Sequence, residues 1–264
     1  MDVDGLRCVV TGAASGIGGE VTARLLAGGA AVTALDRVPA VEDVRTVEVD
    51  LADPDSIDAA LTELDGEYDA LFNIAGVPGT PEQPGELVMR VDFLGLRHLT
   101  EHMLDRLRPG GAIVNIASVA AAGWPQRLET IKELLATETF DDGLRWFAEN
   151  PPDGNPYRLA KEAVIVYTMA SALRLRERGL RMNALLPGSV ETPMLAEVQR
   201  SMGTELLDGV RDLIGRHATP ADIAPAAVFL ASPDSRWISA TTVIVDGGYS
   251  GAISTELVTP PVLT

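Results

Sequence analysis

Thr11-Gly12-Ala13-Ala14-Ser15-Gly16-Ile17-Gly18 joins an apolar run at residues 7–10 to an amphipathic stretch at 16–27. The run predicts a strand and the stretch predicts a helix, which puts the glycines at the turn between them. Glycine allows unusual backbone angles there and lets the backbone approach a pyrophosphate, while the helix N-terminus offers free N–H groups to phosphates. No Gly-Lys-Ser/Thr follows, which excludes a P-loop. We therefore predict a dinucleotide site at Gly12, Ser15, Gly16, Ile17 and Gly18.

Strand-like and helix-like segments alternate along the rest of the chain. Strands are predicted at residues 7–10, 31–35, 46–49, 70–73, 112–116, 181–186 and 242–245, and helices at 16–27, 54–64, 86–107, 156–176 and 220–231. Several strands are apolar nearly throughout, which is typical of a parallel sheet covered on both faces. The alternation predicts an α/β protein, with one domain over residues 1–264 and a doubly wound parallel sheet of about seven strands.

Two stretches, residues 124–155 and 192–217, interrupt this alternation. Both have apolar residues at helical spacing, so we expect a helical insertion in the first and further helices in the second. Long connections of this kind are often functional.

Composition and charge restrict the partners of the protein. The net charge of −17 argues against a nucleic-acid partner, and no apolar stretch reaches the roughly 20 residues of a membrane span, so we expect neither partner. The one cysteine, Cys8, lies in an apolar run and is expected to be a small core residue. The sequence begins with neither a basic nor an apolar leader, and we expect a cytoplasmic location.

Asp36 ends the second predicted strand, where a carboxylate accepts hydrogen bonds from an adenosine ribose. A 2′-phosphate would meet a like charge there, so we predict NAD(H) rather than NADP(H). The adjacent guanidinium of Arg37 could still bind a phosphate, and a plain turn residue is the alternative for Asp36. Asp50 and Leu51 end the third strand, where Asp50 could accept from the adenine amino group or cap the next helix.

Asn73-Ile74-Ala75-Gly76 ends the fourth predicted strand, and Asn73, Ala75 and Gly76 are expected beside the cofactor. Tyr157 and Lys161 are four residues apart on a predicted helix, so their side chains share one face. A nearby ammonium group favours the phenolate, and we expect it to lower the pKa of Tyr157 for proton transfer.

Taken together, these segments resemble the short-chain dehydrogenase/reductase family over nearly the whole chain. The family's TGxxxGIG matches residues 11–18, its NNAG matches 73–76, and its YxxxK matches Tyr157 and Lys161. Ser118 matches the catalytic serine, and Asp246-Gly247-Gly248 matches a C-terminal signature. The stretch that holds the nicotinamide carboxamide matches residues 187–193, with Pro187, Gly188, Val190 and Thr192 as contacts.

The resemblance implies a single-domain Rossmann fold with helices on both faces of the sheet and a nicotinamide cofactor. It implies that Tyr157 is the general acid/base and that Lys161 lowers its pKa and binds the nicotinamide ribose. It also implies that Ser118 donates a hydrogen bond to the substrate oxygen.

Two positions depart from the family pattern. Ile74 replaces the second Asn of NNAG, and Asp92 replaces the Asn of the catalytic tetrad. In the family, that Asn holds a water beside the lysine through its main-chain carbonyl, a role that Asp92 could keep. A carboxylate near Lys161 would offset part of the effect of the lysine on Tyr157, and we expect Asp92 to be a tolerated substitute.

The insertion at 124–155 resembles that of bacterial 3α-hydroxysteroid dehydrogenase/carbonyl reductases, which share the Gly154-Asn155 lead-in to the Tyr segment. Helices flanking this insertion build an oligomer face in many family members, and an inserted helix should cover it. We therefore predict a homo-oligomer, and a dimer rather than a tetramer.

Residues 192–217 correspond to the family's substrate lid. Met194, Leu195 and Met202 of this lid, with Trp124 of the insertion, are expected to line an apolar pocket, although ordinary helix packing is the alternative for each. We predict hydride transfer between NAD(H) and a hydrophobic secondary alcohol or ketone, with a hydroxysteroid or another alicyclic alcohol favoured.

The alternatives are another small alcohol, a sugar or an acyl-carrier substrate, and a non-catalytic NAD(H)-binding module. The presence of Ser118, Tyr157 and Lys161 together disfavours the module. His98 and His102 lie one helical turn apart, but the sequence shows no third ligand, so we predict no metal site.

Overall fold

The computed structural model describes residues 1–40 and 44–257. Within these ranges seven strands form one parallel sheet in the order β3-β2-β1-β4-β5-β6-β7. The strands are β1 (Arg7–Thr11), β2 (Ala31–Asp36), β3 (Arg45–Glu48), β4 (Tyr68–Asn73), β5 (Leu107–Ile116), β6 (Arg181–Pro187) and β7 (Thr242–Val245). The order reverses direction between β1 and β4, so the predicted doubly wound sheet is confirmed. A crevice is expected at that point, outside the carboxyl ends of the strands.

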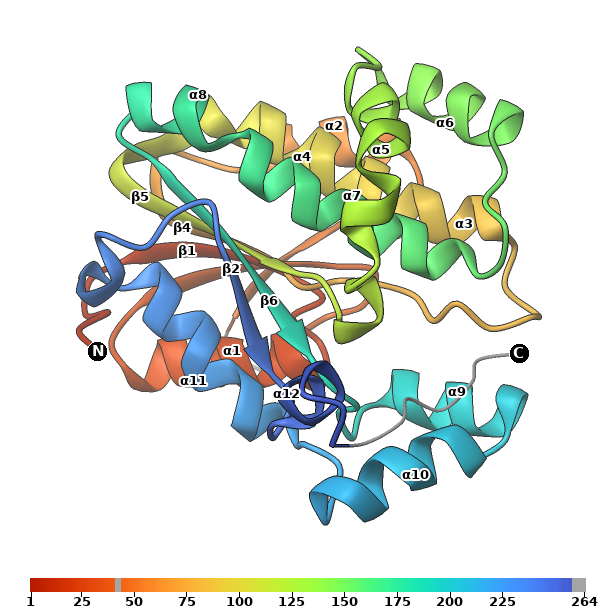
Figure 1. Cartoon of the computed structure of the whole chain (residues 1–264). Helices are drawn as coiled ribbons and strands as arrows, with labels where there is room; N and C mark the ends of the chain where they lie inside the picture. Colours follow the sequence, from red (N-terminus) through yellow and green to blue (C-terminus); the bar gives the residue numbers. More distant parts are fainter. Residues whose placement is uncertain (41–43, 258–264) are drawn as a thin grey trace.

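Helices cover both faces of the sheet (Figure 1). One face carries α1 (Gly16–Ala27) and α11 (Pro220–Ala231), and the other carries α2 (Pro54–Glu63), α4 (Leu96–Met103) and α7 (Pro156–Ala170). Each face has its own hydrophobic core, because successive strand residues point to opposite sides. On β1, Val9 packs into the α7-side core, whereas Cys8 and Val10 pack into the α1-side core.

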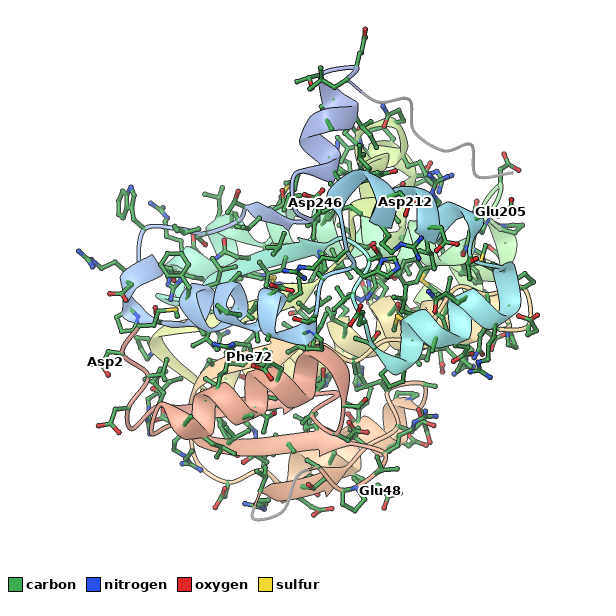
Figure 2. The ribbon with its side chains drawn as sticks, turned by 90° about the horizontal axis from the view of Figure 1, so that it is seen from below. Asp2, Glu48, Phe72, Glu205, Asp212 and Asp246 are labelled. Carbon is green, nitrogen blue, oxygen red and sulfur yellow. The ribbon has the colours of Figure 1, made fainter. Side chains whose placement is uncertain are left out.

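The view from below shows α1 and α11 lying across the sheet (Figure 2). Phe72 of β4 is fully buried, whereas Asp2, Glu48, Glu205 and Asp212 are exposed. These acidic side chains show how the negative charge is spread over the surface. In the part of the chain that the structure describes, no helix is long and apolar enough to cross a membrane.

The helix predicted over residues 86–107 is interrupted. It consists of α3 (Gly85–Met89), the π-helical turn η1 (Arg90–Gly95), α4 and the 3-10 turn η2 (Leu104–Arg106), and β5 begins at Leu107. Gly95 lets this turn approach the chain after β3, because a Cβ at Gly95 would lie 2.2 Å from the carbonyl oxygen of Leu51. π-helical turns occur frequently at functional sites, and this one carries Asp92.

The two stretches that interrupt the alternation are helical. Residues 124–155 contain η4 (Trp124–Arg127), α5 (Leu128–Leu135) and α6 (Phe140–Glu149). The helix α5 packs against α7, and α6 packs against α3 and η1. After β6 come α9 (Pro193–Met202) and α10 (Glu205–Ile214), which lie beyond the end of the sheet near α12 (Tyr249–Ser254) (Figure 1). The remaining elements are α8 (Ala172–Glu177), η3 (Val119–Ala121) and η5 (Pro233–Ser235).

Candidate active site

A cavity of about 980 Å³ opens at the carboxyl ends of the strands. It is lined by residues at or just after the carboxyl ends of β1 to β6, by the start of α7 and by the helix α9. The sequence-predicted residues on its wall are Gly12, Ser15, Gly16, Ile17, Gly18, Asp36, Arg37, Asp50, Leu51, Ala75, Gly76, Ser118, Tyr157, Lys161, Pro187, Gly188, Val190 and Thr192. The fold thus gathers motifs from the whole chain at the expected edge of the sheet.

The glycine-rich turn leaves room for a phosphate group. Gly12 and Gly16 have positive φ angles of 69° and 55°. A Cβ at Gly12 would lie 2.9 Å from the backbone of Ala75, and one at Gly18 would lie 2.0 Å from the carbonyl oxygen of Gly12. Ser15 precedes α1 but its side chain makes no capping hydrogen bond. The N–H groups of the first turn of α1 therefore remain available to an anion, which fits the pyrophosphate of a dinucleotide.

Asp36 is held at the end of β2 by main-chain donors. Its Oδ2 accepts a hydrogen bond from the N–H of Ala14 at 3.0 Å, and its Oδ1 accepts one from the N–H of Arg37 at 2.7 Å. The side chain is partly buried and lies on the cavity wall, whereas Arg37 is exposed. The arrangement presents a fixed carboxylate where the ribose of an adenosine would bind.

Asp50 also lies on the wall, but it does not cap α2. Asp53 caps this helix by accepting a hydrogen bond from the N–H of Asp55. The Oδ1 of Asp50 accepts from the N–H of Ala52 at 2.9 Å. The capping alternative for Asp50 is therefore wrong, and Asp50 remains a residue of the cavity wall.

Tyr157 stands in the first turn of α7, and Asn155 sets its position. The Oδ1 of Asn155 caps the helix by accepting from the N–H of Tyr157 at 2.9 Å. Its Nδ2 donates to the carbonyl oxygen of Gly79 at 2.6 Å, which ties the start of α7 to the loop after β4. Gly79 lets this loop lie close to Tyr157, because a Cβ at Gly79 would lie 2.3 Å from the Cβ of Tyr157. Sequence reasoning missed this role, although an Asn followed by Pro156 is a helix N-terminus signal.

Lys161 lies one turn further along α7 and is 2% exposed. Its Nζ donates to the carbonyl oxygen of Ile116 at 3.1 Å and lies 5.6 Å from the ring centroid of Tyr157. It also lies 3.2 Å from the Oδ2 of Asp92, which is fully buried. The contact between Lys161 and Asp92 is an ion pair. It is not also a hydrogen bond, because Oδ2 of Asp92 accepts none from the described residues. The other oxygen of Asp92 accepts from the N–H of Val77 at 2.8 Å.

These groups shift each other's pKa values. Burial raises the pKa of Tyr157; Lys161 opposes this shift, Asp92 adds to it, and the hydroxyl of Ser118 opposes it. Lys161 lowers the pKa of Tyr157 as expected, but desolvation outweighs the ammonium group and the net shift of this pKa is upward. Burial alone would lower the pKa of Lys161, but Asp92 and Tyr157 reverse the direction and raise it. Burial also raises the pKa of Asp92, and Lys161 offsets part of this shift.

Ser118 follows β5 and lies on the same wall as Tyr157. Its Oγ accepts a hydrogen bond from the N–H of Ala120 at 3.1 Å, so its own hydrogen is free to point elsewhere. A hydroxyl in this place can donate to a substrate oxygen beside the phenol of Tyr157.

Three predicted residues lie off the cavity wall. Asn73 is buried, and its Nδ2 donates to Thr100 and Asn115 at 2.8 Å each. It therefore joins the sheet to the helices rather than facing the cavity. Trp124 packs against the α7-side core, and Asp92 lies behind Lys161.

The lid residues Met194, Leu195 and Met202 do line the cavity, with Val198 and Leu207 beside them. Two polar contacts join α9 to the loop after β4. The Nε2 of Gln83 donates to Glu197 at 3.1 Å, and Ser201 hydrogen-bonds to Glu82. Apolar side chains of the lid thus line part of the same cavity as Tyr157.

A doubly wound sheet, a glycine-rich turn with free N–H groups and a Ser–Tyr–Lys set around one cavity form the arrangement of an oxidoreductase with a dinucleotide site. Comparison with known proteins agrees. Residues 7–128 match the family described as short chain dehydrogenase, and residues 148–250 match one described as Enoyl-(Acyl carrier protein) reductase. The chain belongs to the short-chain dehydrogenase/reductase family, whose members named below act on alcohols.

Three relatives illustrate the family. A coniferyl-alcohol dehydrogenase of Pseudomonas sp. (strain HR199) is 40% identical over 253 residues, which cover 95% of this chain and 98% of that protein. A 3beta-hydroxysteroid dehydrogenase 1 of Eggerthella lenta is 30% identical, covering 94% and 95%. The crystal structure of the 3-alpha-hydroxysteroid dehydrogenase from Pseudomonas sp. B-0831, complexed with NADH, superposes with a TM-score of 0.78 at 28% identity, covering 96% and 99%.

Proposed function

We propose that this protein catalyses hydride transfer between NAD(H) and a hydrophobic, ring-bearing alcohol and its carbonyl partner. The observation that carries the proposal is the cavity itself, which is lined both by Ser118, Tyr157 and Lys161 and by apolar side chains of the lid. When bound, NAD(H) supplies the hydride chemistry. The protein supplies the binding surfaces and the proton transfer.

In this proposal Tyr157 moves the proton. In the reducing direction its phenol donates to the carbonyl oxygen, and in the oxidising direction its phenolate accepts the proton of the alcohol. Ser118 donates a hydrogen bond to the same oxygen and stabilises its charge. The raised pKa of Tyr157 keeps the phenol form at neutral pH, so carbonyl reduction is favoured there and alcohol oxidation gains as pH rises.

Asp36 supports a preference for NAD(H). Its carboxylate is fixed by two main-chain donors at the end of β2, and a 2′-phosphate placed there would be repelled. The NADH complex of the steroid dehydrogenase relative fits the same preference.

The substrate class rests on the lid and on the relatives. Met194, Leu195 and Met202 offer an apolar surface, and the relatives named above act on a phenylpropenol or on steroids. Both kinds of substrate carry a hydroxyl on or near a hydrophobic ring system. We place coniferyl alcohol first, because that relative has the higher identity, and hydroxysteroids and alicyclic alcohols next.

A substrate panel tests the proposal. NADH formation would be measured at alkaline pH with coniferyl alcohol, a 3-hydroxysteroid, a cyclic alcohol and a sugar alcohol, each with NAD and with NADP. We expect turnover of at least one ring-bearing alcohol with NAD. Turnover of the sugar alcohol alone, or a higher kcat/KM with NADP, would contradict the proposal.

We also propose that the protein assembles as a dimer. The helices α5 and α6 cover the start of α7, α3 and η1, so that part of the molecule is shielded from a further copy. Sedimentation velocity would give the mass, and a tetramer assembled through the outer face of α7 would contradict the idea.

A further inference from the structure

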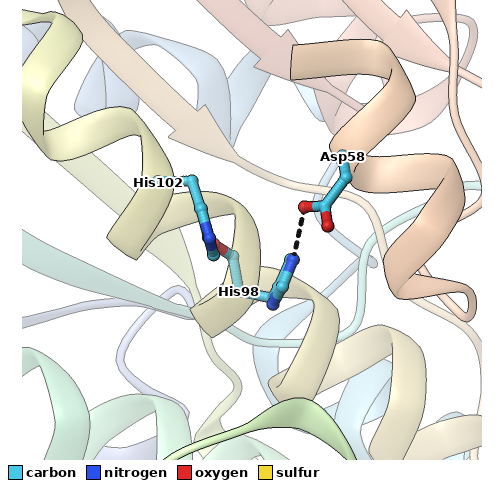
Figure 3. A group of neighbouring side chains, drawn as sticks. All are labelled: Asp58, His98 and His102. Atoms are coloured by element: carbon cyan, nitrogen blue, oxygen red, sulfur yellow. Dashed lines mark hydrogen bonds and ion pairs between the residues drawn. The ribbon is translucent and has the colours of Figure 1, made fainter. Parts of the chain in front are cut away.

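Two histidines and a carboxylate meet between α2 and α4, away from the large cavity (Figure 3). Asp58 comes from α2, and His98 and His102 come from α4. Each offers one ligand atom, and these atoms all lie within 4.8 Å of one another. A hollow of about 260 Å³ adjoins them, lined by Asp58, Leu61, His102 and Arg106. The cluster belongs to a separate place on the molecule, since none of these side chains lines the large cavity.

The two imidazoles lie close together on α4. His98 and His102 are one turn apart on one helix face, with ring centroids separated by 4.3 Å. The Nδ1 of His102 lies 2.8 Å from the carbonyl oxygen of His98. In a neutral ring this nitrogen donates to the carbonyl, which leaves the lone pair on Nε2. Metal-binding histidines are commonly oriented in this way.

The third ligand comes from a distant part of the sequence. The Oδ1 of Asp58 lies 2.7 Å from the Nε2 of His98, although the two residues are 40 positions apart in the chain. This separation is why the sequence showed only a histidine pair. A hydrogen bond accounts for the contact between Asp58 and His98, and the exposed His102 adds a second imidazole to the same place. The Nε2 of His102 has no hydrogen-bond partner among residues 1–40 and 44–257.

One nearby cation opposes a metal ion, and its position limits the repulsion. The guanidinium of Arg106 donates to the carbonyl oxygen of Leu64 at 2.6 Å, which holds it at the C-terminal end of α2. Asp58 supplies a negative charge to the same hollow, and its side chain is 55% exposed, so an ion can reach it.

We propose that Asp58, His98 and His102 bind one Zn²⁺ ion. Two imidazole nitrogens and one carboxylate oxygen are ordinary zinc ligands, and a water molecule completes the tetrahedron. The ion would link α2 to α4, and it would stabilise the folded chain because the unfolded chain does not hold the three ligands together. The chain has only three histidines, and the third, His217, is 7% exposed and hydrogen-bonded to Ser189.

The test uses the whole, tag-free protein after treatment with a chelator. Calorimetric titration with zinc chloride should show one ion per chain. Both His102→Gln and Asp58→Asn should weaken zinc binding at least ~tenfold, because each removes a ligand. Glu63→Gln is the matched control, since it removes an exposed carboxylate from α2 outside the cluster and should bind zinc as the parent does.

Thermal unfolding provides a second readout. Zinc at about 100 times its Kd should raise the midpoint by roughly 5 °C or more in the parent protein and in Glu63→Gln, and much less in His102→Gln. Zinc binding that does not saturate at one ion, or that is equal in the parent and in both ligand variants, would overturn the proposal. Circular dichroism checks that these exposed substitutions leave the fold intact.

Discussion

Lys161 and Asp92 form a buried ion pair, with Nζ and Oδ2 3.2 Å apart and the two side chains 3% and 0% exposed. The pair joins the helix of Tyr157 to the π-helical turn η1. Burial of a single charge in this place would be costly, so each group stabilises the charged form of the other. Asp92 therefore acts on Tyr157 through Lys161 and by its own field, since it raises the pKa of both.

Removal of both partners of this pair should destabilise the fold by less than the two single removals added together. Asp92→Asn or Lys161→Met alone leaves one buried charge without its partner, and we expect a loss of about 3 kcal/mol in the free energy of unfolding. The double variant should lose clearly less than the sum. Urea unfolding of the four proteins measures this coupling, and strictly additive losses would show that the pair is not coupled.

Asp92→Asn should nevertheless remain active. Asp92 does not reach the cavity, and Asn has the same shape, so we expect kcat within about tenfold of the parent value. Steady-state kinetics on the best substrate would test this, with Lys161→Met as the comparison that should lose far more. A hundredfold loss in Asp92→Asn would make its carboxylate essential.

Asp36 should control the choice of cofactor. Replacing it by Ser removes the negative charge that would repel a 2′-phosphate, so the ratio of kcat/KM for NAD to that for NADP should fall at least ~tenfold, a difference of about 1.4 kcal/mol. The variant Asp50→Asn serves as control, because Asp50 lines the same cavity but lies two residues after β3. An unchanged ratio in Asp36→Ser would assign the selectivity elsewhere.

Asn155 should position Tyr157. In Asn155→Ala the cap of α7 and the bond to Gly79 are both lost, and we expect a stability loss of about 1 kcal/mol with a several-fold drop in kcat. Asn155→Asp keeps the capping oxygen but loses the donor to Gly79. If kcat falls equally in the two variants, the bond to Gly79 carries the positioning. If kcat stays at the parent value in both, Asn155 is only structural.

Cys8 should make stability depend on pH in alkaline solution. It is fully buried in β1, as its apolar surroundings predict, and burial raises its pKa from 9.0 to about 12. Above pH 9 the unfolded thiol loses its proton while the folded thiol keeps it. The free energy of unfolding should therefore fall with rising pH, by about 1.4 kcal/mol per unit until about pH 12. Other groups titrate in this range, so the measurement is the difference between the parent and Cys8→Ala, which should lack this slope. Parallel curves for the two proteins would contradict the assignment.

The parts of the fold and site that could be predicted are those set by local sequence. The turn around Gly12, the carboxylate of Asp36 and the one-turn spacing of Tyr157 and Lys161 each depend on a few neighbouring residues. Their places on one cavity follow from the parallel sheet, because all strands end at the same edge.

The parts that could not be predicted depend on packing between distant segments. Asn73 was expected beside the cofactor, but its partners on β5 and α4 draw it into the core. The pKa of Tyr157 depends on how much water the fold excludes, which spacing does not reveal. Asp58 joins the two histidines only because α2 packs against α4.

The most direct test of the central claim is the kinetics of Tyr157→Phe, which removes one oxygen and keeps the ring. NADH formation from the best alcohol of the panel would be followed from pH 7 to pH 10 in this variant and in the parent. We expect the parent rate to rise with pH, because the pKa of Tyr157 is raised, and the variant to lose at least ~100-fold in kcat and to lack this rise. Equal rates and equal pH profiles in the two proteins would contradict the assignment of Tyr157 as the proton-transfer group.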